Sequence, residues 1–268
     1  MGKVLGLAST IITTNKLAYV ISAILLGSLI MILSISVPSI SSIYWIIEKG
    51  GVWSAFIETL KDALASPIAF TYVLIATAAL DALSSKRRGS SIITLLPVNR
   101  SDIIKATYLI TLVTAITATL VGTYVSSIYA YFTSGLKISS DYPVIIFSIY
   151  LVALVPTMIF ITSLGMLIYS LTPIRSNIPW ILAVVYLIGI PIIMGILGGV
   201  VRSEYLSKLI LSILIPSYGL LNYMQHLMIG NAFIDVNTLT YFIASITSVS
   251  VITPLAIVVF NTYAEVSL

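Results

Sequence analysis

Long apolar runs, separated by short polar segments, divide this chain into units of membrane-spanning length. The first run, Leu17–Val37, carries no charge and would form a helix about 31 Å long, enough to cross the ~30 Å hydrocarbon core of a bilayer. Five further runs, which carry few charges, are also predicted to span the membrane. The predicted spans are residues 17–37, 67–83, 103–132, 144–171, 180–200 and 239–261. The pattern therefore predicts an all-α integral membrane protein with six transmembrane helices in a single domain, residues 1–268.

Shorter elements are predicted outside these spans. Residues Met1–Lys16 are mildly amphipathic and predict an entry helix before the first span. Between the fifth and last spans, Leu209–Ile215 and Leu220–Ile229 are too short to cross a bilayer. Pro216 separates these two runs, and we expect both to form re-entrant or interfacial helices.

The basic segment Ser84–Lys105 stands out from its apolar surroundings. Three consecutive cations open the segment, Gly89 follows them, and Pro97 ends a short apolar run. Asn99 then precedes Asp102 by three residues, a spacing typical of the start of a helix. We expect a short surface helix between the second and third spans, then a turn, then the third span.

Composition excludes several classes of protein. The chain is 59% hydrophobic and 8% charged, whereas a soluble domain carries about 25% charged residues. It has no cysteine and one histidine, which excludes disulfides, cysteine redox chemistry and multi-histidine metal sites within one chain. The nucleotide-binding P-loop, the H-E-x-x-H zinc motif and the G-x-S-x-G serine motif are all absent. We therefore predict no catalytic residue, no metal ligand and no cofactor in this chain.

The distribution of charge predicts an orientation. With the N-terminus inside, the inner segments hold eight of the 13 cations and the outer segments hold most of the acids. The inner cations are Lys3, Lys16, Lys86, Arg87, Arg88, Arg100, Lys105 and Arg175. By the positive-inside rule, both termini and the basic segment lie in the cytoplasm, and the protein belongs to the cell membrane. This rule also explains the net charge of +4 without a nucleic-acid partner.

Ionisable residues lie at the ends of the predicted spans rather than inside them. Asp81, near the inner end of the second span, caps that helix or takes part in gating. The scarcity of charge inside the bilayer counts against a transporter coupled to protons or sodium. Lys86, Arg87 and Arg88 fit an anchor on anionic lipid. The following run, Ile92–Leu96, fits either an interfacial helix or a helix that docks on a partner.

The run L-L-P-V-N-R-S-D-I-I-K that ends at Lys105, with Gly89 before it, resembles the loop between spans two and three of type-2 ABC transporter permeases. The stretch from Pro216 to Gly230 also resembles the broken segment that precedes the last span in that family. One departure is the acid that usually follows the glycine, because Ser90, Ser91 and Ile92 stand there.

The resemblance implies a permease subunit that pairs with a second copy or a paralogue and docks on two separate ATPase subunits, which bind ATP and magnesium. It implies coupling residues in the loop, namely Gly89, Ile92, Ile93, Leu95, Leu96, Pro97 and Arg100. The substrate would be hydrophobic or amphipathic and would leave the cytoplasm. The alternatives are a secondary transporter or channel that needs no ATPase, a structural membrane subunit and, with the least support, an intramembrane enzyme.

Overall fold

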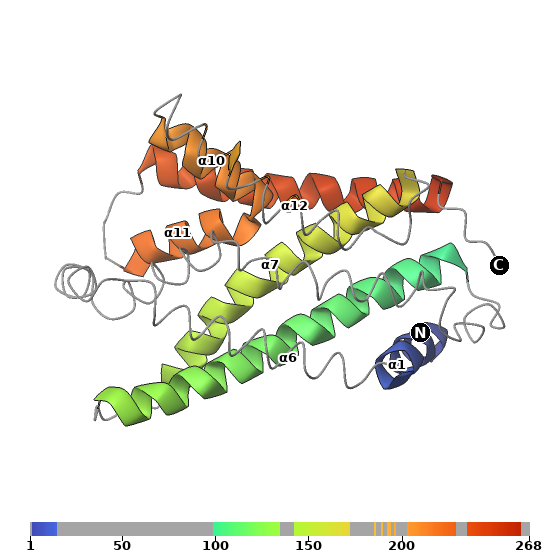
Figure 1. Cartoon of the computed structure of the whole chain (residues 1–268), viewed down its shortest axis with the longest axis horizontal. Helices are drawn as coiled ribbons and strands as arrows, with labels where there is room; N and C mark the ends of the chain where they lie inside the picture. The colour runs from blue at the N-terminus through green and yellow to red at the C-terminus, as the bar shows by residue number, and fades with distance from the viewer. Residues whose placement is uncertain are drawn as a thin grey trace.

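The computed structural model describes residues 2–14, 99–134, 142–171, 203–228 and 235–263, together with residues 185, 189, 192, 193 and 196. Every element in this part of the chain is a helix, which confirms the all-α fold class there (Figure 1). The helices are α1 (Gly2–Thr14), α6 (Arg100–Ser134), α7 (Tyr142–Leu171), α10 (Glu204–Leu214), α11 (Pro216–Met228) and α12 (Val236–Tyr263).

Three of these helices, α6, α7 and α12, are long and apolar enough to cross a membrane. They cover the third, fourth and last predicted spans. Helices α10 and α11 would count as a fourth if they form one bent span. The predicted spans 17–37 and 67–83 lie outside the described residues, as does most of 180–200. The long apolar helices are those of a membrane protein, and the number of six spans stays a prediction.

Helix α6 begins where the sequence predicts. The backbone carbonyl of Asn99 accepts hydrogen bonds from the N–H groups of Asp102 (2.9 Å) and Ile103 (3.2 Å), which closes the first turn. Asp102 lies in that turn, where a negative charge favours the positive end of the helix dipole. The helix therefore begins directly after Asn99, as the spacing of Asn99 and Asp102 predicts.

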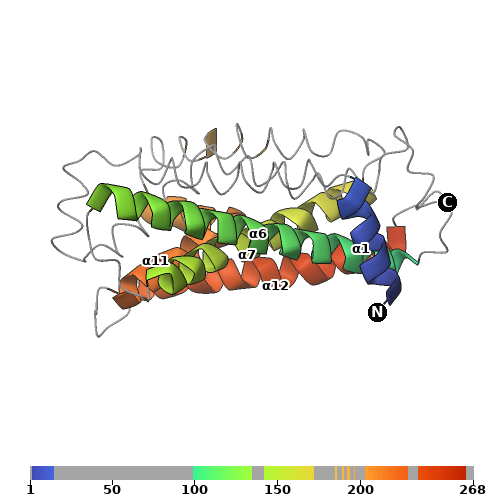
Figure 2. The ribbon, with the colours of Figure 1, turned by 90° about the horizontal axis from the view of Figure 1, so that it is seen from below.

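Helix α6 runs antiparallel to α7 and α12, which run in the same direction as each other (Figures 1 and 2). Helix α7 lies between α6 and α12 and packs against both, while α11 packs against α7 and α12. Helix α1 packs on α6. In Figure 1 the start of α6, the end of α7 and the end of α12 lie at one end of the molecule, beside α1, and α10 and α11 lie toward the other.

Hydroxyl groups join the helices at buried positions. The Ser163 hydroxyl of α7 donates to Oγ1 of Thr253 on α12 at 3.1 Å. Tyr108 of α6 lies 2.8 Å from the same hydroxyl. Ser163 has only one proton, which either Thr253 or the Ile159 carbonyl of its own helix (2.7 Å) accepts, so Tyr108 is the donor in its bond to Ser163. Thr111 and Thr162 make a second link between α6 and α7, at 3.1 Å. Hydrogen bonds of this kind hold helices together where the surroundings are apolar.

Candidate functional site

Most residues predicted to take part in coupling lie outside the described part of the chain. These are the predicted coupling residues Gly89, Ile92, Ile93, Leu95, Leu96 and Pro97, the predicted anchor Lys86, Arg87 and Arg88, and the predicted gating residue Asp81. Arg100 is the predicted site residue that the structure describes. Two regions of the described helices bear on function. One is the base, where α1 and the start of α6 meet the ends of α7 and α12, and the other is the elbow between α10 and α11.

Arg100 joins the start of α6 to the end of α12. Its Nη1 donates a hydrogen bond of 2.7 Å to the backbone carbonyl of Asn261. Asn261 lies in the last turn of α12, where backbone carbonyls have no N–H partner within the helix. A cation at this position also favours the negative end of the helix dipole. Arg100 therefore caps α12 from a residue that is distant in the sequence.

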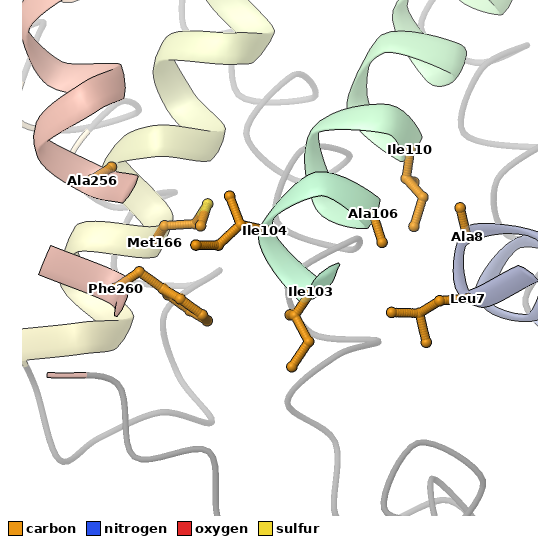
Figure 3. Close-up of a cluster of buried hydrophobic side chains, with 9 residues drawn as sticks. All are labelled: Leu7, Ala8, Ile103, Ile104, Ala106, Ile110, Met166, Ala256 and Phe260. Carbon is orange, nitrogen blue, oxygen red and sulfur yellow. The ribbon is translucent and has the colours of Figure 1, made fainter. Parts of the chain in front are cut away.

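The base is filled by buried apolar side chains from four helices (Figure 3). On one side of α6, Ile104 points toward Met166 of α7 and Phe260 of α12. On the other side, α6 presents small and branched side chains to Leu7 and Ala8 of α1. The Phe260 ring also stacks on Tyr169, with ring centres 5.8 Å apart. The first turns of α6 are thus held between α1 and the ends of α7 and α12.

The elbow is the junction between α10 and α11, which are bent by 116° relative to each other. Both helices begin earlier than the predicted runs Leu209–Ile215 and Leu220–Ile229. Ser203 caps α10 by accepting the N–H of Leu206 at 3.3 Å, and Glu204 pairs with Lys208 at 2.6 Å. The predicted runs followed apolar residues alone, whereas these polar contacts start the helix at Glu204.

At the elbow the backbone carbonyl of Ser212 has no N–H partner within its helix, and a side chain from α12 supplies the hydrogen bond. The last bond of α10 runs from the N–H of Ile215 to the carbonyl of Leu211, at 2.7 Å. The next carbonyl, that of Ser212, would normally accept from residue 216, but Pro216 has no N–H. The Ser245 hydroxyl of α12 donates to the Ser212 carbonyl instead, at 3.0 Å. Ser212 and Ser245 are fully buried, so water does not supply this bond.

Helix α7 supplies a hydrogen-bond partner for the first turn of α11, on the other side of the elbow. The N–H of Ser217, in the first turn of α11, donates to Oγ1 of Thr157 at 3.2 Å. The Thr157 hydroxyl in turn donates to Oγ of Ser217 at 2.7 Å. Both residues are fully buried. Thr157 thus acts as an N-terminal cap for α11, supplied from another helix.

Gly219 allows α11 to lie directly against α12. A Cβ atom at this position would meet the Tyr241 carbonyl oxygen and the Ser245 hydroxyl, and would lie 2.8 Å from the Tyr241 carbonyl carbon. Further along α11, Tyr223 stacks on Phe242, with ring centres 4.4 Å apart. Tyr205, at the start of α10, lies 5.7 Å from Tyr241 between ring centres. Both arms of the elbow therefore lie beside the first part of α12.

Tyrosines aside, the polar side chains buried inside the described helices are all serine or threonine hydroxyls, so the buried contacts of the elbow are made by hydroxyl groups and backbone. Among these residues no group of three or more His, Cys, Asp or Glu side chains is placed to hold a metal ion. Sequence reasoning missed Thr157, Ser212 and Ser245. The one signal was Pro216, which required a substitute donor but did not indicate which residue would provide it.

A scan against protein-family models, a search of curated proteins and a search of solved structures each find no match to this chain.

Proposed function

We propose that this chain is the membrane-spanning permease subunit of an ABC exporter. In this proposal it pairs with a second copy or a paralogue in the cell membrane, with both termini in the cytoplasm. It docks on separate ATPase subunits through the loop of residues 84–105. Movement of the loop on ATP binding drives a hydrophobic or amphipathic substrate outward, and α10 and α11 form a re-entrant hairpin before the last span.

The observation that carries this proposal is the position of α6 relative to the loop. Helix α6 starts at Arg100, only a few residues after the apolar run Ile92–Leu96. Its first turns are held in the base by α1, α7 and α12. A force applied to the loop would therefore reach four helices through close packing, because packed side chains transmit displacement rather than absorb it.

The test is copurification of an ATPase from gently solubilised membranes. Replacing Ile93 and Leu96 by Asp places unpaired charges in the docking surface, which costs several kcal/mol and weakens binding by more than about 100-fold. We expect the double variant I93D/L96D to insert normally but to lose a stoichiometric P-loop ATPase. The control S84D/S85D adds the same charge to the same loop outside the apolar run. Retention of the ATPase by I93D/L96D, or no ATPase with the native chain, would contradict the proposal.

The elbow favours a second candidate, a secondary transporter. Interrupted helices build the binding sites of many such transporters. Pro216 interrupts a helix here, with the freed backbone groups bonded by side chains of α7 and α12. The test measures the uptake of candidate substrates into liposomes that contain the purified chain and no ATPase. An ion gradient that drives uptake without ATP would establish this candidate and displace the ABC exporter.

A further inference from the structure

Helix α12 makes a polar contact with each of three other helices, at three evenly spaced residues. Near its start, Ser245 donates to the Ser212 carbonyl of α10. In its middle, Thr253 accepts from Ser163 of α7, whose hydroxyl also donates to the Ile159 carbonyl of its own helix. At its end, the Asn261 carbonyl accepts from Arg100 of α6. Successive contacts are about 12 Å apart along the helix, so the outer two are about 24 Å apart.

Few residues in the most apolar part of α12 are buried, so much of this helix has no neighbour in the described part of the chain. The most apolar part of α12 is only 17% buried, against 56% for α6 and 53% for α7. Much of its outer face is exposed and apolar. The exposed residues there include Leu239, Ile243, Ile246, Val251, Leu255 and Val258. Helix α12 nevertheless packs against α7, α10 and α11, and the three polar contacts act together with this packing to fix its position.

We propose that α12 is the strut that connects the base to the elbow, with Arg100 and Ser245 as the positioning residues at its two ends. The inference rests on the proposed function in one respect, because it takes the displacement to start at the loop before Arg100. Pulling on Arg100 shifts α12, and the shift moves Ser245 relative to the Ser212 carbonyl.

A small shift of α12 is enough to break the hydrogen bond between Ser245 and the Ser212 carbonyl at the elbow. The Ser245–Ser212 bond is 3.0 Å long, and a hydrogen bond is lost beyond about 3.5 Å, so a displacement of roughly 1 Å is sufficient. The Ser212 carbonyl then has no donor, because Pro216 offers none. A buried carbonyl without a partner disfavours the closed elbow, so α10 separates from α12.

Thiol labelling in the full-length chain tests the strut directly. The chain has no cysteine, so the variant L211C carries a single reporter thiol at a position of α10 that is 6% exposed. Labelling at this position requires α10 to move away from the helices that it packs on, α11 and α12. We expect S245A to raise the labelling rate about 10-fold, since it removes one buried hydrogen bond. T253V and R100A should each raise it about 3-fold through α12.

Three further variants separate transmission from general loosening. K105A removes an exposed cation from the same end of α6, and S248A removes a bond that stays within α12, so both should leave the rate unchanged. R100K keeps a cation and a donor and should restore most of the protection. A second reporter, L154C, lies at a fully buried position of α7 and should stay protected in every variant.

Two results would overturn the proposal. In the first, S245A exposes L211C but R100A and T253V do not, so that the elbow is held only locally. In the second, R100A exposes L154C as much as L211C, so that Arg100 stabilises the whole bundle. Neither labelling measurement requires an ATPase. A failed strut therefore leaves the docking proposal intact, and failure to copurify an ATPase leaves the labelling result intact.

Discussion

The base and the elbow are both junctions of several helices, but different forces hold them. At the base, apolar side chains such as Ile104, Met166 and Phe260 fill the space, and one exposed cation caps α12. At the elbow, the decisive contacts are hydrogen bonds from the fully buried hydroxyls of Thr157 and Ser245. The base is held by contacts between apolar side chains, whereas at the elbow side chains supply the hydrogen bonds that an interrupted backbone lacks.

The difference follows from whether water can reach the unpaired backbone groups at each junction. Arg100 and Asn261 lie at exposed helix ends, where water is an alternative partner. Pro216 and Ser217 lie at a buried interruption, where only protein groups can replace the missing backbone bonds. A buried helix break therefore requires specific polar residues on its neighbours, and an exposed helix end does not.

The strongest test of this contrast is the close approach at the elbow. Gly219→Ala places a Cβ against the backbone of α12, which cannot yield as a flexible side chain would. We expect a loss of about 3 kcal/mol or more, seen as a fall of about 10 °C in the melting temperature in detergent. The control Gly6→Ala, in α1, has nothing within 4 Å of the new atom and should be neutral or slightly stabilising. Equal melting temperatures for the two variants would show that α11 does not pack against α12 as described.

At the base, removal of apolar volume should have the next largest effect. Ile104→Ala creates a cavity among Met166, Phe260 and α6, and should cost about 2–3 kcal/mol. The matched control is Leu112→Ala on the same helix, whose side chain is exposed and which should cost less than about 0.5 kcal/mol. Thermal unfolding in detergent measures both. A smaller loss for Ile104→Ala than for Leu112→Ala would mean that apolar packing does not hold the base.

Loss of a single cap at the elbow should have the smallest effect of the three. Thr157→Val keeps the shape of the side chain but leaves the N–H of Ser217 without its acceptor, at a cost of about 1–2 kcal/mol. The control Thr117→Val removes a hydroxyl that bonds only to Val113 of its own helix, at an exposed position. Amide hydrogen exchange at Ser217 should quicken in the first variant alone. Unchanged exchange there would argue against Thr157 as the cap of α11.

The sequence by itself determined the helical fold class of the described residues and the approximate positions of their long apolar helices. Runs of apolar residues placed the ends of α6, α7 and α12 within three residues, because helix length and burial in an apolar phase depend mainly on local composition. Asn99 and Asp102 also placed the start of α6. The docking loop itself rests on resemblance and stays a prediction.

Only the tertiary structure decided which groups meet. Arg100 bonds to a carbonyl 161 residues away, and the elbow is completed by Ser245 and Thr157, which are 33 and 60 residues from their partners. A hydrophobic pattern records that a residue is buried but not which neighbour it touches. Pro216 indicated that a backbone donor was missing. The identity of each partner depended on how α7 and α12 pack around the elbow, because a hydrogen bond requires atoms to lie within about 3.5 Å of each other.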